Sequence, residues 1–247
     1  MLVSPRSSAA LAVVAASAAL AAHAAALAAQ PVTIGTGPPP ATSPYAALLG
    51  TSGPLPSFAV GQSFAAPSGV RRLDAVQFWV RNDPNAVLPP NDFRLLTYRL
   101  FVTAYDSVAR QVAGSPLFVS ASRPGFASTA AAATSFSTGG LAVQPGALYL
   151  AFLVPDEPTF PFPLSPHQGE ALGFNGDAYA GGRAYTIQYL AGFDPGPLTG
   201  VWTAQAGDFA FSAAFDAVPE PATWALVGAG LLTTGAAARV RQRVRRR

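Results

Sequence analysis

The central part of the chain alternates apolar and polar residues with a period of two, which is the pattern of β-strands with one buried face. The stretch RLLTYRLFVTAYD, which starts at Arg94, places on one face Leu96, Tyr98, Leu100, Val102 and Ala104. Near the end of this part, the stretch DFAFSAAFD places inward Phe209, Phe211, Ala213 and Phe215. The same alternation places outward Asp208, Ser212 and Asp216.

Two further stretches fit the same architecture. VRRLDAVQFWV aligns Val76, Phe78 and Val80 on one side of a strand, and ALYLAFLV at 147–154 is apolar on both faces, as a central strand can be. Glycine and proline separate these stretches. We therefore predict an all-β fold, an antiparallel β-sandwich of jelly-roll-like form over residues 57–217, preceded at 30–56 by a proline- and glycine-rich lead-in.

The N-terminal 29 residues have the order of a secretory signal peptide. Arg6 precedes a long alanine-rich apolar run, and small residues follow before Gln30. Cleavage would start the mature chain at Ala29 or Gln30, and the alternative is an uncleaved N-terminal anchor. Both alternatives predict export of the β-rich part.

Residues 218–247 combine a proline motif, an apolar run and a basic end. Pro219, Glu220 and Pro221 precede residues 222–238, which carry no charge and are just long enough for a transmembrane helix. The basic tail at 239–247 contains Arg239, Arg241, Arg243, Arg245, Arg246 and Arg247. Such charge stops translocation and stays on the cytoplasmic side. A nucleic-acid-binding tail and a buried core helix are the alternatives, but neither explains this order.

The C-terminal thirty residues resemble a PEP-CTERM sorting signal, with Pro219-Glu220-Pro221 as its motif. The resemblance implies recognition and removal of the anchor by a membrane enzyme, an exosortase, often in bacteria that make extracellular polysaccharide. GQSFAAPSGVRRLDAVQFWVRN, RLFVTAYD and LAVQPGALYLAFLV more faintly resemble a β-sandwich ectodomain of exported bacterial proteins with such tails. That second resemblance implies a fold and no reaction.

Composition narrows the functions of the central part. The chain has no cysteine, which excludes disulfides, cysteine metal sites and cysteine nucleophiles. Outside the two termini, 8 arginines stand against 11 acidic residues, a net charge of −3. This part therefore lacks the positive charge of a nucleic-acid partner, and we expect none.

Aromatic residues are the candidate ligand-binding residues, because flat apolar rings can stack on sugars. The candidates are Trp79, Tyr179, Tyr185 and Trp202. Trp79 lies opposite Val76, Phe78 and Val80 on its strand, and that face could be either core or an exposed platform.

Metal and catalytic signals are weak. Asn175 and Asp177 flank a glycine and could donate oxygen ligands to calcium, although Asn-Gly is first a turn former. Hydrolysis would need groups such as His167 or paired acids among Asp156, Glu157 and Glu170, and no nucleophile elbow surrounds a serine. We expect no cofactor and no enzymatic activity.

These features predict a protein exported through an inner-membrane-anchored intermediate to the cell surface or medium. Its sandwich would have a structural or adhesive role in an extracellular polysaccharide matrix, as in a biofilm. The alternatives are a carbohydrate-binding module and, more distantly, a secreted hydrolase.

Overall fold

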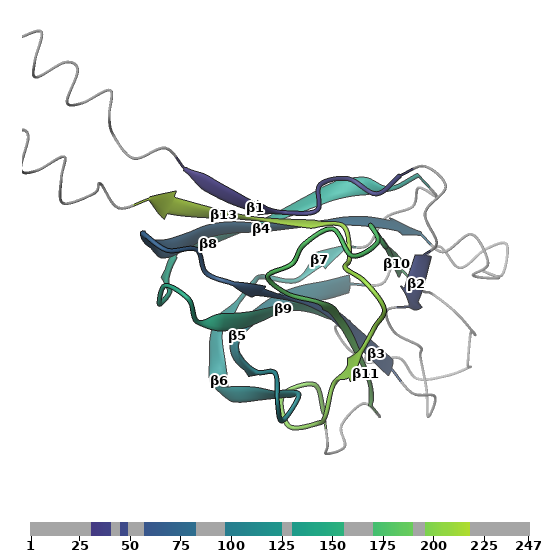
Figure 1. Ribbon diagram of the computed structural model, residues 1–247. Coiled ribbons are helices and arrows are strands. Elements are labelled where there is room, and N and C mark those ends of the chain that lie inside the picture. Colours follow the sequence, from purple (N-terminus) through teal and green to yellow (C-terminus); the bar gives the residue numbers. More distant parts are fainter. Residues whose placement is uncertain are drawn as a thin grey trace, which may run out of the picture. The chain divides into compact units, whose positions relative to one another are not determined.

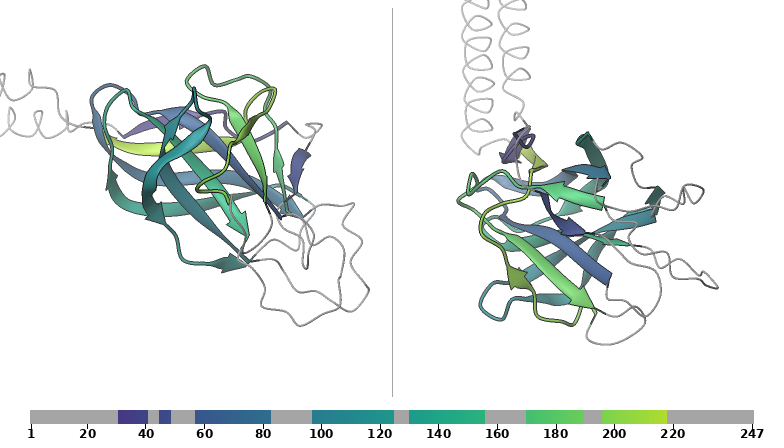
Figure 2. Two further views of the ribbon diagram at one scale, coloured as in Figure 1. Left: turned by 90° about the horizontal axis from the view of Figure 1, so that it is seen from below. Right: turned by 90° about the vertical axis from the view of Figure 1, so that its right-hand side faces the viewer.

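Two antiparallel sheets, called sheet A and sheet B below, form the domain (Figures 1 and 2). The structure, a computed structural model, describes residues 31–40, 45–48, 57–82, 97–124, 130–155, 170–189 and 196–217. Sheet A is ordered β1 (Val32–Gly35), β13 (Phe211–Ala217), β4 (Val70–Asn82), β10 (Glu170–Gly173) and β2 (Tyr45–Leu48), and β8 (Ala132–Ala142) also pairs with β4. Sheet B is ordered β12 (Thr203–Ala204), β11 (Ala184–Tyr189), β3 (Ser57–Ala65), β9 (Leu148–Pro155), β5 (Thr97–Asp106) and β6 (Gln111–Val119), and β7 (Arg123–Pro124) also pairs with β5.

The inner faces of the two sheets share one hydrophobic core, which confirms the predicted all-β sandwich. Sheet A contributes the fully buried Val76, Phe78 and Val80, and sheet B contributes Tyr98, Leu100 and Val102. Aromatic rings join the layers: Phe64 of β3 meets Phe215 of β13 edge to face at 6.1 Å between centroids, and Tyr98 meets Phe136 of β8 at 6.3 Å. The period of two in the sequence therefore corresponds to burial between two sheets.

Strand β9 is buried on both faces, as its continuous apolar run predicts. Its alternate residues Tyr149, Ala151 and Leu153 belong to the core between the sheets. Leu150 and Phe152 instead belong to a second buried cluster on the other face of sheet B. A central strand with both faces covered needs no polar alternation.

The second cluster, called the outer cluster, covers the face of sheet B that points away from sheet A. It contains Ala59, Tyr105, Leu150, Phe152, Tyr185, Ile187, Tyr189 and Trp202. The partner of Phe152 on β3 is Gly61, where an added Cβ atom would come within 2.5 Å of the Phe152 Cβ. The segment 196–202 folds over this face, and the Trp202 N–H of the main chain donates to the Arg110 carbonyl at 2.8 Å.

A buried polar pair joins strand β3 of sheet B to the segment that leads into β13 of sheet A. Gln62 of β3 donates from Nε2 to the Asp208 Oδ1 at 2.7 Å, and its Oε1 accepts from the Phe209 N–H at 2.9 Å. Both side chains are fully buried. The outward placement expected for Asp208 was wrong, because regular strand β13 begins only at Phe211 and the alternation does not extend back through Gly207, whose φ is +108°.

Two strands of sheet A come from the stretch expected as a lead-in. β1 pairs with β13 in the register Val32↔Phe215 and Ile34↔Ala213, and Val32 and Ile34 pack against the core. β2 pairs with β10. The partner strands of β1 and β2 lie more than 100 residues away in sequence. The proline- and glycine-rich composition of this stretch therefore does not predict its strands, because they form through long-range pairing.

Strand β6 lies at the end of the strand order of sheet B and is irregular. Gly114 has a φ of +83°, Pro116 lacks an N–H, and the register with β5 shifts between Val102 and Ala104. Leu117 and Val119 are exposed on this strand. A bulge and a proline are common devices at sheet edges.

The Phe215 ring should be one of the main stabilising groups of the sandwich. Phe215→Ala removes a fully buried ring that contacts the opposite sheet, so we expect a loss of about 3–5 kcal/mol in the free energy of unfolding. Val108→Ala, at a side chain that is 93% exposed, should change it by less than about 0.5 kcal/mol. Urea unfolding of the two variants measures the difference, and equal midpoints would contradict the assignment.

Candidate functional site

The predicted sorting residues lie outside the described residues, so the structure shows only the strand that leads to them. These are Pro219, Glu220, Pro221, the span at 222–238 and the six arginines from Arg239 to Arg247. No helix of the described part is long and apolar enough to cross a membrane. Strand β13 ends at Ala217, and its partner in the sheet at Phe215 is Val32 of β1.

Trp79 lies on the outer face of sheet A and is partly exposed. Its strand neighbours Phe78 and Val80 point into the core, and its partner across β8 is the exposed Ala133. The next cross-strand pair on this face is Gln77 and the exposed Ser135. The structure thus places Trp79 outside the core between the sheets, with Arg81 two residues further along the same face of β4.

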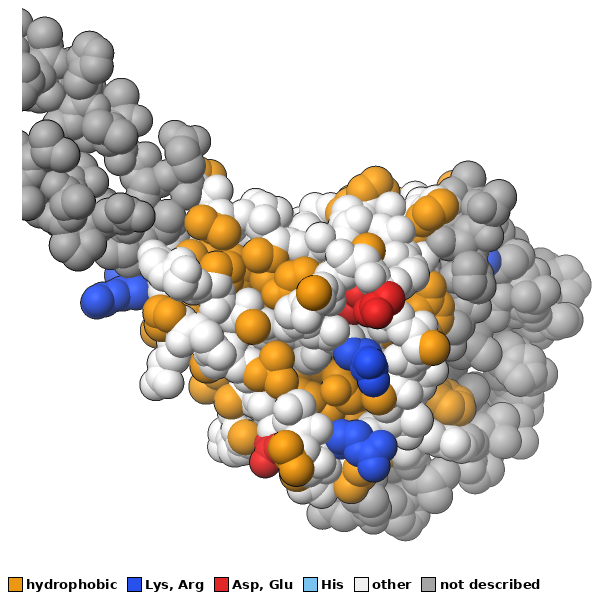
Figure 3. All heavy atoms as spheres, viewed as in Figure 1, with side chains coloured by type: hydrophobic (Ala, Val, Ile, Leu, Met, Phe, Trp, Pro, Cys, Tyr) orange, Lys and Arg blue, Asp and Glu red, His pale blue; other side chains and the backbone are white. Residues whose placement is uncertain are grey.

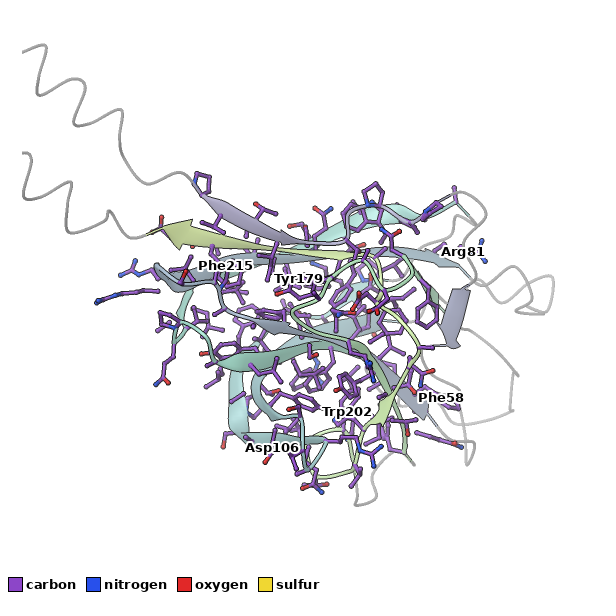
Figure 4. The ribbon with its side chains drawn as sticks, in the orientation of Figure 1. Phe58, Arg81, Asp106, Tyr179, Trp202 and Phe215 are labelled. Atoms are coloured by element: carbon purple, nitrogen blue, oxygen red, sulfur yellow. The ribbon has the colours of Figure 1, made fainter. Side chains whose placement is uncertain are left out.

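Trp202 and Tyr185 are buried together in the outer cluster. Trp202 is fully buried, its ring meets Phe152 edge to face at 5.0 Å, and its Nε1 donates to the Pro197 carbonyl at 3.1 Å. Tyr185 packs edge to face against Tyr105 at 4.9 Å, and burial together with this neighbour raises the pKa of the Tyr105 hydroxyl. Neither Trp202 nor Tyr185 offers a free ring face to a sugar. Figure 4 shows Trp202 on one side of sheet B, with Tyr179 and Phe215 on the other.

Tyr179 packs at the margin of the core between the sheets. Its ring meets Phe211 edge to face at 5.4 Å, and its hydroxyl donates to the Ala65 carbonyl at 3.3 Å. Burial raises the pKa of this hydroxyl. The contacts assign Tyr179 a packing role, so the four aromatic candidates do not gather into one platform.

Asn175 and Asp177, the calcium candidates, are not arranged as a ligand set with other acids. The Asn175 Nδ2 donates to the Thr36 carbonyl at 2.7 Å and to the Pro38 carbonyl at 3.3 Å, so its amide holds the chain after β1. Asp177 is exposed. Across the described ranges, no group of three or more His, Asp or Glu side chains could hold a metal ion.

His167, Asp156 and Glu157, which a hydrolase would use, lie outside the described residues. The backbone of Glu170 begins β10.

Asp208 is the polar residue that sequence reasoning missed. Its Oδ2 accepts from the Tyr179 N–H at 2.8 Å, while Oδ1 accepts from Gln62. Burial raises the pKa of the Asp208 carboxyl, and the hydrogen bonds from Tyr179 and Gln62 partly oppose this effect. The available signal was a glutamine and an aspartate inside apolar stretches, VGQSF and GDFAF, which suggests a buried polar pair.

The raised pKa of Asp208 predicts a pH dependence of stability with a definite sign. At pH values above the ordinary pKa of 3.8, the Asp208 carboxyl of the folded protein still holds its proton while that of the unfolded chain has lost it. The contribution of Asp208 to the free energy of unfolding therefore falls as the pH rises through the folded pKa. In Asp208→Asn that decline should disappear, even if the variant is less stable overall. Thermal unfolding between pH 3 and 7 measures it.

The exposed Val108→Ala variant is the control for that experiment, and it should keep the wild-type pH profile. A profile of Asp208→Asn parallel to the wild type would contradict the assigned shift.

Comparison with known proteins addresses the C-terminal segment. A family model described as the PEP-CTERM protein-sorting motif matches residues 217–242, which include Pro219-Glu220-Pro221 and the apolar run. No match to the chain was found among curated proteins. Such a motif indicates export, a membrane-anchored intermediate and processing by an exosortase. The resemblance of the C-terminal residues to a sorting signal is thereby confirmed: the chain carries a PEP-CTERM sorting motif at residues 217–242, after a β-sandwich domain.

Proposed function

We propose that the protein is a non-catalytic structural or adhesive component of an extracellular polysaccharide matrix, delivered through its C-terminal sorting motif. The observation that carries the proposal is the match at residues 217–242, which begins at the last residue of the last strand. On this proposal the signal peptide exports the chain, the arginines stop translocation, and cleavage near Pro219-Glu220-Pro221 frees the sandwich.

The sandwich itself is suited to a passive role outside the cell. Its stability depends on a large aromatic core and buried hydrogen bonds, because the chain has no cysteine for disulfides. The face of the domain in Figure 3 is mostly apolar and neutral polar, with few charged side chains. A low surface charge favours contact with neutral polymers over salt-dependent binding to charged ones.

Intact mass of the protein from cells and from culture medium tests the sorting proposal. The native product should lack the first 28 or 29 residues and the segment after about Pro221. The variant Pro219→Ala with Glu220→Ala should keep its full C-terminal length and remain in the membrane fraction. Ser107→Ala with Val108→Ala, in the exposed turn after β5, should be processed like the native chain. An intact native tail would show a permanent anchor and contradict the proposal.

A carbohydrate-binding module is the second candidate function, and the exposure of Trp79 favours it. The indole lies on the outer face of sheet A opposite the small Ala133, where a pyranose ring could stack on it and the Gln77 and Ser135 side chains could bond hydroxyls.

For this second candidate, Trp79→Ala should weaken binding of the purified domain to soluble neutral polysaccharides by about two- to tenfold, because one stacked ring contributes on the order of 0.5–1.5 kcal/mol beyond its buried area. Affinity electrophoresis measures the change. Leu117→Ala, an exposed site on sheet B, should leave binding unchanged. Equal retardation of the native domain and Trp79→Ala would remove this candidate.

A further inference from the structure

The end of the folded domain and the start of the sorting motif coincide in the chain. Strand β13 runs from Phe211 to Ala217, and the motif match begins at residue 217. Pro221 follows Ala217 by four residues, a distance of at most about 14 Å in a fully extended chain. Any enzyme that cleaves near Pro219-Glu220-Pro221 must therefore act within a short distance of β13.

Strand β13 is paired in the sheet up to Phe215, which faces Val32 of β1. It lies between β1 and β4 in sheet A, so it has a hydrogen-bonded neighbour on each side. Phe211, Ala213 and Phe215 are fully buried, and Phe215 contacts Phe64 of the opposite sheet. Peeling the end of β13 away would expose Phe215 and break pairing on both sides, so the folded arrangement is the one that a processing enzyme meets.

On the outer side of this end of sheet A, the β1–β13 pair carries small side chains, and the exposed Arg71 and Arg72 lie at the start of the neighbouring strand β4. Thr33 of β1 pairs with Ala214 of β13, and both point away from the core, as does the exposed Asp216. We call Thr33, Ala214 and Asp216 the β1–β13 corner. Small side chains at such a corner let another protein surface approach closely, and Asp216 is the one charged group of the three.

We propose that the membrane enzyme that cleaves at the sorting motif binds the folded sandwich at the β1–β13 corner, an inference that rests on the proposed sorting function. A small globular domain is about 30 Å across, roughly twice the longest reach from Ala217 to Pro221. The catalytic groups of an enzyme of that size therefore cannot reach the peptide between Ala217 and Pro221 unless the enzyme surface around them contacts the sandwich. The partner is thus a peptidase with a flat surface beside the cleft that takes the motif.

The test blocks the corner without disturbing the fold. Thr33→Tyr with Ala214→Tyr places a cross-strand aromatic pair on the outer face, an arrangement that antiparallel strands accommodate well. In cells that contain the native processing enzyme, we expect pulse-chase cleavage of this variant to slow by about fivefold or more, with the melting temperature of the purified domain unchanged. Leu117→Tyr with Val119→Tyr, at exposed positions of sheet B, is the matched control and should be cleaved at the native rate.

A linker inserted before the motif shows whether slow cleavage comes from the blocked docking surface or from a general defect in processing. Ten Gly/Ser residues inserted between Ala217 and Val218 add about 17 Å of root-mean-square reach, so the enzyme could engage the motif away from the corner. The linker should therefore restore rapid cleavage to the blocked variant. Cleavage of the blocked variant at the native rate would overturn the inference.

Ile34→Ala weakens the packing of β1 beside β13. Faster cleavage of Ile34→Ala would show that the enzyme acts on a frayed strand, and would also overturn the inference. If the native chain is never shortened, the sorting proposal itself fails. If the native chain is cleaved and the blocked variant is cleaved at the same rate, only the docking inference fails.

Discussion

The hydrogen-bonded pair of Gln62 and Asp208 is the constraint that holds the crossing from β12 of sheet B to β13 of sheet A against strand β3. A buried amide and a buried carboxyl each cost free energy unless their polar atoms are satisfied, and here each satisfies the other while also bonding the main chain at Phe209 and Tyr179. Apolar packing alone would tolerate small shifts of one sheet over the other. The polar pair does not, so it fixes the position where the chain enters β13.

Much of the fold followed from alternation within single strands. The inward residues of β4, β5 and β13 are those that the sequence pattern selects, and the two apolar faces of β9 correspond to its central place in sheet B. β1 and β2 could not be found in this way. A four-residue strand is stabilised mainly by its neighbours, and those neighbours, β13 and β10, are distant in sequence.

The candidate ligand residues show a second limit of sequence reasoning. An aromatic residue on the face opposite the core has the same alternation whether that face is bare or covered by a loop. Trp79 and Tyr185 both have this position on their strands, but the segment 196–202 covers only the face that bears Tyr185. Whether a loop covers the outer face of a strand depends on how that loop folds back over the sheet, and the periodicity of the strand does not predict this. The sorting motif was found because its information is local and linear, in the order of motif, apolar run and arginines.

The irregular edge strand β6 affects how copies of the domain can associate at high local concentration. A protein sorted to one surface in many copies meets its own kind at a local concentration far above that in bulk solution, and a straight, regular edge would invite those copies to add strand to strand into fibres. Gly114 turns the β6 backbone out of line and Pro116 leaves a gap in its row of donors. At this edge of sheet B, two copies that meet would therefore touch through side chains rather than through a continuous ladder.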